Sequence, residues 1–307
     1  MTERRTAPDA WPYLALAAGA LCIAWSAIFV RWTDMPGPAS AFYRMLIPAI
    51  VLAPTWLIAP RSPRVNGKTL LVTAVGGLFF ALDLAFFNTS ILKTSAANAT
   101  LLGNNTPVFV GLLSWLIFRK RPSAAFWLGL LLAFAGSGVI VSADLMRHFK
   151  LGWGDAMALA AAACFAVYMI ATERVRTTTS TLVFLRLATV SSAIFLFIIN
   201  VSLGISLKIP AGHSWAALLG LGLVSQLGGY LALTYALGHL PATAASISLL
   251  SQGPLTAVLA ALLLAEPLSF AQILGGLLVL SGVGLANRRL SAASEVPDNL
   301  VEVSGPE

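Results

Sequence analysis

Two stretches of this sequence match in part, WPYLALAAGALC at residues 11–22 and WGDAMALAAAAC at residues 153–164. Each copy begins with a tryptophan and ends with a cysteine. Each also opens an apolar run of about 20 residues, the length of helix that crosses the hydrocarbon core of a bilayer. The repeat therefore predicts that two halves of the chain begin with the same kind of membrane helix.

The rest of each half repeats in the same order. The recurring landmarks are Phe42-x-Arg44 with Phe184-x-Arg186, Pro107 with Pro254, Pro122 with Pro267, and Gly129, Gly136 and Gly138 with Gly275, Gly282 and Gly284. Such an ordered series indicates a duplicated unit rather than chance identity. The unit holds five predicted helices, an odd number, so the second copy enters the membrane from the opposite face. Inverted repeats are typical of secondary transporters, whose substrate site lies near the midplane between the halves.

The composition excludes a soluble fold. Of the 307 residues, 58% are hydrophobic and only 10% are charged, and the mean hydropathy is +0.85. Soluble domains hold roughly 25% charged residues. We therefore predict an all-α integral membrane protein with ten transmembrane helices, arranged as two five-helix repeats of inverted topology. The helices are expected near residues 12–32, 39–59, 68–91, 96–118, 125–143, 153–172, 181–203, 214–237, 243–264 and 270–287.

The Lys and Arg residues predict the orientation. With an even number of spans, twelve of the 19 fall on one side and five on the other, while Arg44 and Arg186 lie within spans. Cytoplasmic loops carry the excess of Lys and Arg, so both termini are expected in the cytoplasm. The net charge of +7 is spread over short loops and is not gathered in a patch, which argues against nucleic-acid binding.

The predicted organisation follows from these spans. It comprises a cytoplasmic N-terminus at 1–11, a first repeat at 12–143, an external loop at 144–152, a second repeat at 153–288 and a disordered cytoplasmic tail at 289–307. The tail is polar and contains proline, a composition typical of disorder.

Two motifs point to a known family. They are Ser40-Ala41-Phe42-Tyr43-Arg44 at the start of the second helix, and Pro254 followed by Ala265-Glu266-Pro267, Gly275 and Gly282-Val283-Gly284. Both resemble the EamA family of the drug/metabolite transporter superfamily, over residues 12–288. The first half departs from the family, because Lys120 stands where a glutamate is usual. Glu266 is accordingly interpreted as a capping or loop residue.

The resemblance implies a multi-pass transporter of the bacterial inner membrane, and not an enzyme. The substrates it implies for export are amino acids, aromatic or neutral ones among them, carried by alternating access. An alternative keeps the fold but makes the substrate anionic, a sugar phosphate or nucleotide sugar held by Arg44 and Arg186. A remote alternative is a membrane-embedded enzyme that acts on lipid, which needs an acid–base pair or a metal at one depth.

The expected partners are a small-molecule substrate and the lipid bilayer. No cofactor is expected, and no metal, because His148, His213 and His239 are scattered in or beside loops. The recurring glycines fit either close helix packing or a dimer face, so both a monomer and a homodimer stay open.

Charged groups inside the predicted spans are the candidates for coupling or gating, because charge is expensive in a bilayer. Asp83 is the only acid well inside a span, and it is interpreted either as a functional group or as half of a structural ion pair. Arg44 lies at a similar depth, so we expect Arg44 and Asp83 to meet and to hold or gate the outer half. Arg186 has no equivalent acid and is expected to reach Glu173 or the inner headgroups.

A matching pair of polar motifs interrupts the fourth and ninth helices. These are Asn104-Asn105-Thr106-Pro107 and Ser251-Gln252-Gly253-Pro254. Proline removes a backbone donor and frees a carbonyl, so each helix is expected to be kinked or loosened at membrane depth. We expect Asn104, Asn105, Ser251 and Gln252 to bind substrate, and Pro107 and Pro254 to shape the cavity. The competing interpretation is that these amides only hold helices together.

Aromatic residues complete the candidate site. Trp25 and Tyr168 occupy matching places in the first helices of the two halves, and Tyr43 precedes Arg44. All three are predicted to bind substrate.

Overall fold

The protein is described by a computed structural model over residues 10–58, 66–93, 99, 102–119, 122–148, 152–210, 212–263 and 270–293. Within these residues the regular structure is entirely helical, as predicted. Seven helical segments are long and apolar enough to cross a membrane, and the segments 37–52, 106–117 and 124–139 are shorter apolar helices.

The first half of the chain contains seven described helices. They are α1 (Trp11–Ala24), α2 (Ser26–Trp32), α3 (Gly37–Leu52), α4 (Thr55–Ile58), α5 (Gly67–Lys93), α7 (Thr106–Phe118) and α8 (Ala124–His148).

The second half has more interruptions. It comprises α9 (Trp153–Arg176), α10 (Thr181–Ser202), α11 (Gly212–Leu219), a π-helix η1 (Gly220–Gly228), α12 (Gly229–Ala236), α13 (Ala242–Ser248), a short 3₁₀ turn η2 (Leu249–Ser251), α14 (Gln252–Leu263) and α15 (Phe270–Ala293).

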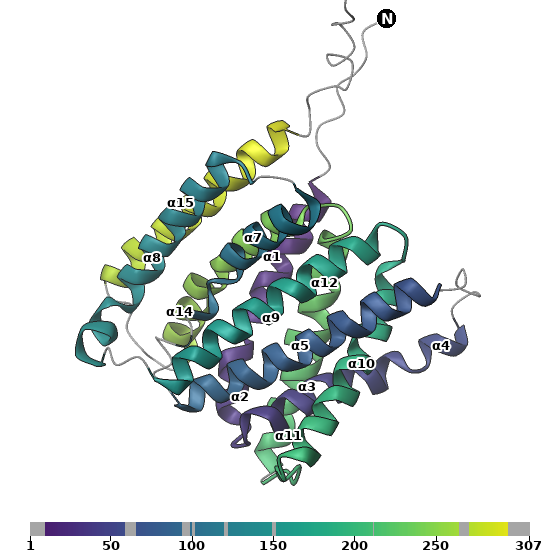
Figure 1. Ribbon diagram of the computed structural model, residues 1–307. Coiled ribbons are helices and arrows are strands. Elements are labelled where there is room, and N and C mark those ends of the chain that lie inside the picture. The colour runs from purple at the N-terminus through teal and green to yellow at the C-terminus, as the bar shows by residue number, and fades with distance from the viewer. Residues whose placement is uncertain are drawn as a thin grey trace, which may run out of the picture.

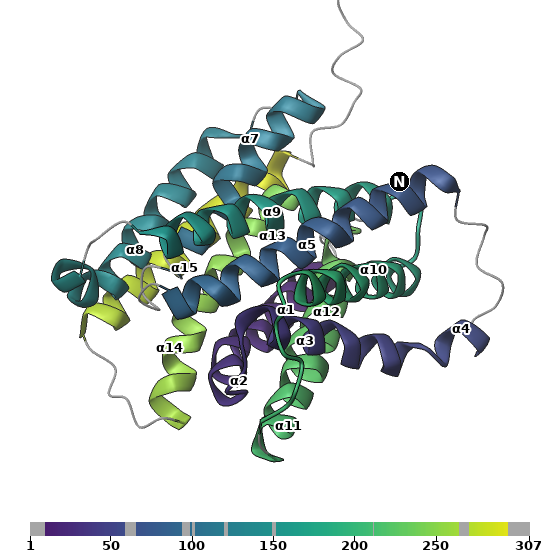
Figure 2. The same cartoon turned by 60° about the horizontal axis from the view of Figure 1, so that its bottom comes forward.

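The helices of the two halves interleave (Figure 1). α5 of the first half lies beside α9 of the second, and α1 packs on η1 and α12. Figure 2 shows α10 between α5 and α3. Hydrogen bonds fasten this arrangement: Ser192 Oγ donates to the Gly77 carbonyl at 2.9 Å, and Asn200 Nδ2 donates to the Pro38 carbonyl at 2.9 Å. The main apolar core therefore draws on both halves.

α8 and α15 form a pair along one edge of the bundle (Figure 1). The recurring glycines make their close approach possible. A Cβ on Gly129 would lie 2.5 Å from the Gly282 carbonyl oxygen, and one on Gly136 would lie 2.5 Å from that of Gly275. These four glycines therefore face one another within the chain and not a second copy, which corrects the dimer-face interpretation for them.

The fourth and ninth helices are interrupted where their prolines predict. In the first half a turn at Asn104 and Asn105 precedes α7, which has Pro107 in its first turn. In the second half the 3₁₀ turn η2 separates α13 from α14, in which Pro254 is the third residue.

Two predicted boundaries are wrong. α8 continues to His148, so residues 144–148 of the expected external loop are helical, and α15 continues to Ala293, so residues 289–293 of the expected tail are helical. Both extensions contain good helix formers and neither Gly nor Pro, so nothing in them stops the helix. Lys120, Glu266, the segments 1–9 and 149–151 and the tail from 294 lie outside the described residues.

Candidate functional site

Arg44 is a buried cation at the interface between the two halves. It lies on α3 and is only 3% exposed. Its Nε donates to Gln226 Oε1 of η1 at 2.9 Å, and its Nη1 donates to Ser26 Oγ at the start of α2, also at 2.9 Å. Its Cζ lies 5.6 Å from the centre of the Tyr230 ring on α12. Residues from both halves therefore hold one guanidinium.

A break in the first helix places Ser26 beside Arg44. α1 ends at Ala24 and α2 begins at Ser26, so Trp25 stands at the junction. The Ile28 amide donates to the Trp25 carbonyl in a tighter turn, while the Ala24 carbonyl accepts the Thr256 hydroxyl of α14 at 3.1 Å. A helix from the second half thus satisfies the carbonyl at this break.

The π-helix η1 places Gln226. It interrupts the α11–α12 helix with a wider turn, a feature often found at functional sites. Close packing fixes its position, since a Cβ on Gly222 would lie 2.8 Å from Ile47 Cβ on α3. Gln226 is buried, and its side-chain oxygen accepts from Arg44 Nε in this arrangement.

Asp83 lies near this cation but does not pair with it. No Asp83 oxygen lies within 4.0 Å of an Arg44 nitrogen, although the two charges interact electrostatically. Among the described residues none forms a hydrogen bond with the Asp83 carboxylate. The prediction that Arg44 and Asp83 meet is therefore wrong as a direct ion pair, because the neutral groups of Gln226 and Ser26 take two of the Arg44 donors.

Aromatic rings fill the space around these charges. Phe80, one turn before Asp83 on α5, stacks on Tyr168 with ring centres 4.3 Å apart and lies 4.8 Å from the Tyr230 ring. Tyr168 is only 1% exposed, so its ring is part of the packed core in this structure. The predicted residues Arg44, Asp83 and Tyr168 are thus brought together around Tyr230.

Other predicted residues lie elsewhere. The Tyr43 hydroxyl donates to the Leu207 carbonyl at 2.8 Å, and its ring packs against Trp215. Arg186 lies against α4, where its Nη1 donates to the Thr55 carbonyl at 2.8 Å and its Cζ lies 4.8 Å from the Trp56 ring centre. The expected contact of Arg186 with Glu173 is wrong, since the partners of Arg186 among the described residues are Thr55 and Trp56.

The amide and serine residues of the two proline motifs are half-buried, and they differ in whether their side chains form hydrogen bonds. Asn104 lies in the turn before α7, Asn105 Nδ2 donates to the Leu102 carbonyl at 2.9 Å, and Ser251 Oγ donates to the Ser248 carbonyl at 2.7 Å. Gln252 makes no side-chain hydrogen bond within the described part of the chain. It stands one turn before Thr256, on the face of α14 that reaches the break at Trp25. Gln252 therefore lies on the part of α14 that contacts the first helix.

Three residues of this site were not predicted from the sequence: Ser26, Gln226 and Tyr230. Gln226 carried a usable signal, because it is the only amide side chain in the predicted span 214–237, and polar groups inside a span are functional candidates by default. Ser26 carried none, since a lone serine is common in membrane helices.

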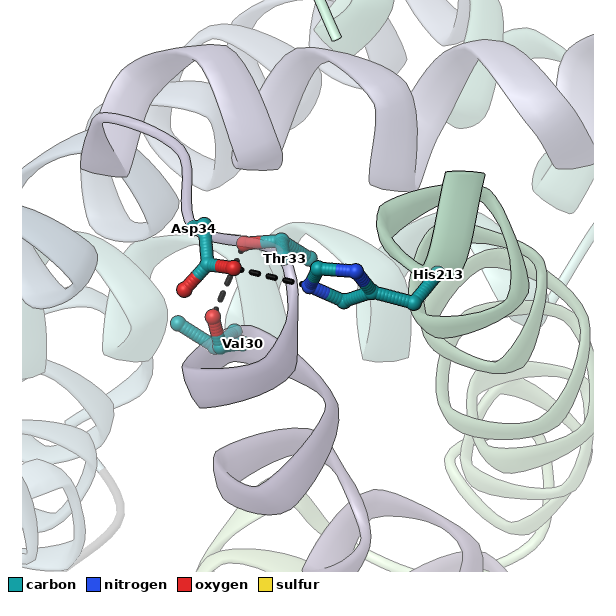
Figure 3. A network of polar contacts seen from close by, with 4 residues as sticks. All are labelled: Val30, Thr33, Asp34 and His213. Carbon is teal, nitrogen blue, oxygen red and sulfur yellow. Dashed lines mark hydrogen bonds and ion pairs between the residues drawn. The ribbon is translucent and has the colours of Figure 1, made fainter. Parts of the chain in front are cut away.

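A second contact joins the halves at the surface (Figure 3). His213 Nε2, at the start of α11, lies 2.8 Å from Asp34 Oδ2 in the turn between α2 and α3. Thr33 beside it donates to the Val30 carbonyl at 2.8 Å. The side chains of His213 and Asp34 are both exposed, at 64% and 61%. This contact joins two described residues within ion-pair distance, and among the described residues no group of three His, Cys, Asp or Glu is placed to hold a metal.

Known proteins share this architecture. A solved crystal structure superposes with a TM-score of 0.74 at 20% sequence identity, covering 92% of this chain and 99% of that one, which shows the fold. A relative from Bacillus subtilis (strain 168), the uncharacterized transporter YwfM, is 31% identical over 221 residues, 67% of this chain and 72% of the relative. The model of the EamA-like transporter family matches twice, over residues 10–142 and 152–288. The chain therefore belongs to the EamA-like transporter family, as a multi-pass membrane transporter of the drug/metabolite transporter type.

Proposed function

We propose that this transporter moves small polar metabolites, amino acids first among them, across the bacterial inner membrane by alternating access between its two halves. The observation that carries the proposal is the buried guanidinium of Arg44, held at once by Ser26 of the first half and Gln226 of the second. A relative movement of the halves changes the surroundings of a group held in this way. Buried charge inside a membrane protein marks substrate and ion pathways.

In the proposed membrane topology the protein has ten transmembrane spans, and both termini lie in the cytoplasm. The three shorter apolar helices then cross the membrane together with the seven long segments, and the Lys and Arg asymmetry gives the orientation. Reporter fusions after Thr178 and after Lys208 test it. A cytoplasmic signal at Thr178 and an external one at Lys208 are expected, and the reverse pair of signals contradicts the proposed orientation.

A multiply charged anion such as a sugar phosphate is a weaker candidate. That substrate would need both arginines, and Arg186 is engaged with Thr55 and Trp56 and not with the residues around Arg44. One guanidinium suits a single carboxylate better than a doubly charged phosphate.

Transport by the purified full-length chain in lipid vesicles tests the function. Radiolabelled amino acids and sugar phosphates are offered in parallel, with and without a proton gradient. We expect uptake of at least one amino acid above that of empty vesicles, and at least a ten-fold loss in Arg44→Gln, since a charged hydrogen-bonding partner contributes about 1.5–3 kcal/mol. Uptake of sugar phosphates alone would favour the anionic alternative. Uptake of neither class would overturn the proposal.

A further inference from the structure

Arg44 and Asp83 lie on the neighbouring helices α3 and α5 and form no direct ion pair. Bringing a cation and an anion into a low-dielectric interior is costly unless each finds a partner. Arg44 nonetheless spends two donors on the neutral oxygens of Gln226 and Ser26, and no Asp83 oxygen lies within 4.0 Å of it. The arrangement leaves the Arg44 guanidinium and the Asp83 carboxyl group without a direct ion pair.

Each of these two side chains keeps a hydrogen-bonding site that no described residue occupies. The third guanidinium nitrogen of Arg44, Nη2, forms no hydrogen bond with a described residue. The carboxylate of Asp83 likewise has no donor from the described part of the chain. Phe80 on the Asp83 helix lies 4.8 Å from the Tyr230 ring, whose centre is 5.6 Å from Arg44 Cζ. The two free sites therefore flank the same pair of rings.

We propose that Gln226 and Ser26 are positioning residues that hold Arg44 away from Asp83, so that one substrate carrying both an anionic and a cationic group can bind between them. The inference rests on the proposed transport function and deepens it. The substrate carboxylate accepts from Arg44 Nη2, and its ammonium group donates to Asp83. The Tyr230 and Phe80 rings lie beside the two groups that bind the substrate poles.

This arrangement predicts strict selection for zwitterions. A monopolar amine leaves the Arg44 guanidinium without a partner, and a monopolar carboxylate leaves Asp83 without one. Leaving a buried polar group unsatisfied carries its full desolvation penalty, so each missing pole should lower transport by about ten-fold or more.

The wild-type chain in lipid vesicles tests this without any substitution. The probes are radiolabelled L-phenylalanine with phenethylamine and 3-phenylpropionate, and L-leucine with 3-methylbutylamine and 4-methylpentanoate. We expect at least one amino acid to be taken up about ten-fold faster than both of its monopolar analogues. If an amine or a carboxylate is carried as fast as its parent amino acid, the proposal that the substrate binds between Arg44 and Asp83 is wrong, while the transport function stands. If no probe is carried at all, both proposals fail together.

Variants then separate positioning from mere structure. Gln226→Glu places a carboxylate at Arg44 Nε, so it should neutralise the cation and raise KM for the amino acid by at least ten-fold with a smaller change in kcat. Asp83→Asn should bring the carboxylate analogue to within about two-fold of the amino acid, because the ammonium partner is gone. Gln272→Glu on α15 is the matched control for adding an acid to a membrane helix and should leave KM unchanged. An unchanged KM in Gln226→Glu contradicts the positioning role.

Discussion

Arg44 and Arg186 hold equivalent sequence positions, yet their partners differ in kind. Arg44 is bound by side chains from both halves, whereas Arg186 is bound by the backbone carbonyl and hydroxyl of Thr55 and by the Trp56 ring. A duplicated residue thus serves the interface between the halves in one copy and fastens α4 to α10 in the other. The duplication preserved the residue type and not its surroundings.

This difference predicts that Arg186 acts on stability more than on transport. Arg186→Lys removes the planar fork at Thr55 and weakens the contact with Trp56, which should lower the free energy of unfolding by about 1–2 kcal/mol. Transport by the folded fraction should stay within about two-fold of wild type, because Arg186 contacts Thr55 and Trp56 and not the residues around Arg44. A two-fold change in rate corresponds to well under 1 kcal/mol. Thermal unfolding in detergent and vesicle uptake measure the two effects. Loss of uptake without loss of stability would place Arg186 on the substrate path.

The individual site residues were only partly predictable. Arg44 and Asp83 stood out because charge in a membrane span needs a reason. Their partners did not, because Gln226 lies 182 residues from Arg44 and reaches it only through the packing of η1 on α3. Depth along a helix can be counted from a sequence, but the direction in which a side chain points cannot.

The helix breaks were likewise predictable from the sequence only in part. Pro107 and Pro254 predict the breaks before α7 and at η2, because proline has no backbone N–H to donate within the helix. The break at Trp25 has no proline or glycine beside it. There the Ala24 carbonyl is satisfied by Thr256, a residue of the other half, so only the tertiary structure explains the break.

We predict that Gln252 and Asn105 are accessible from the substrate pathway. Cysteine is introduced at each position in a chain whose Cys22 and Cys164 are replaced by serine. Small polar thiol reagents should label both sites, and a transported amino acid should slow the labelling at least two-fold. Leu262→Cys, on the same helix as Gln252 but 76% exposed on the outer surface, is the control and should not be protected. Inert cysteines at 105 and 252 would mean that both residues only pack helices.

The α8–α15 pair should be sensitive to a single methyl group. Gly129→Ala places a Cβ against the Gly282 carbonyl oxygen and 2.9 Å from Ala286 Cβ, so the helices must separate, at a cost of about 1–3 kcal/mol of unfolding free energy. Gly284→Ala on α15 meets nothing within 4 Å and is the matched control. It should be neutral or stabilising by about 0.5–1 kcal/mol, since alanine favours a helix. Equal thermal stability of the two variants would show that the close contact of Gly129 with Gly282 does not contribute to stability.

Membrane character and duplication were within reach of the sequence, because both depend on hydropathy and order along the chain. The way in which the halves interleave was not. α10 lies between α5 and α3, and its contacts are single hydrogen bonds such as that of Ser192 with the Gly77 carbonyl. In a bilayer such small-residue contacts and hydrogen bonds decide which helices associate, and apolar periodicity does not reveal them.

Alternating access requires the halves to separate at each surface in turn, and the Asp34–His213 contact offers a way to prevent this at one of them. An exposed ion pair contributes only about 0–1 kcal/mol, so it can open during transport. We expect that Asp34→Cys with His213→Cys, in a chain without Cys22 and Cys164, is bridged by a short bifunctional methanethiosulfonate. The bridged protein should lose at least nine-tenths of its uptake, because the turn before α3 can no longer leave α11, and a reducing agent should restore it. Each single-cysteine variant, treated with the same reagent, should retain its uptake. Full transport by the bridged chain would mean that the halves do not part at this surface, and the alternating-access model would have to place its external opening elsewhere.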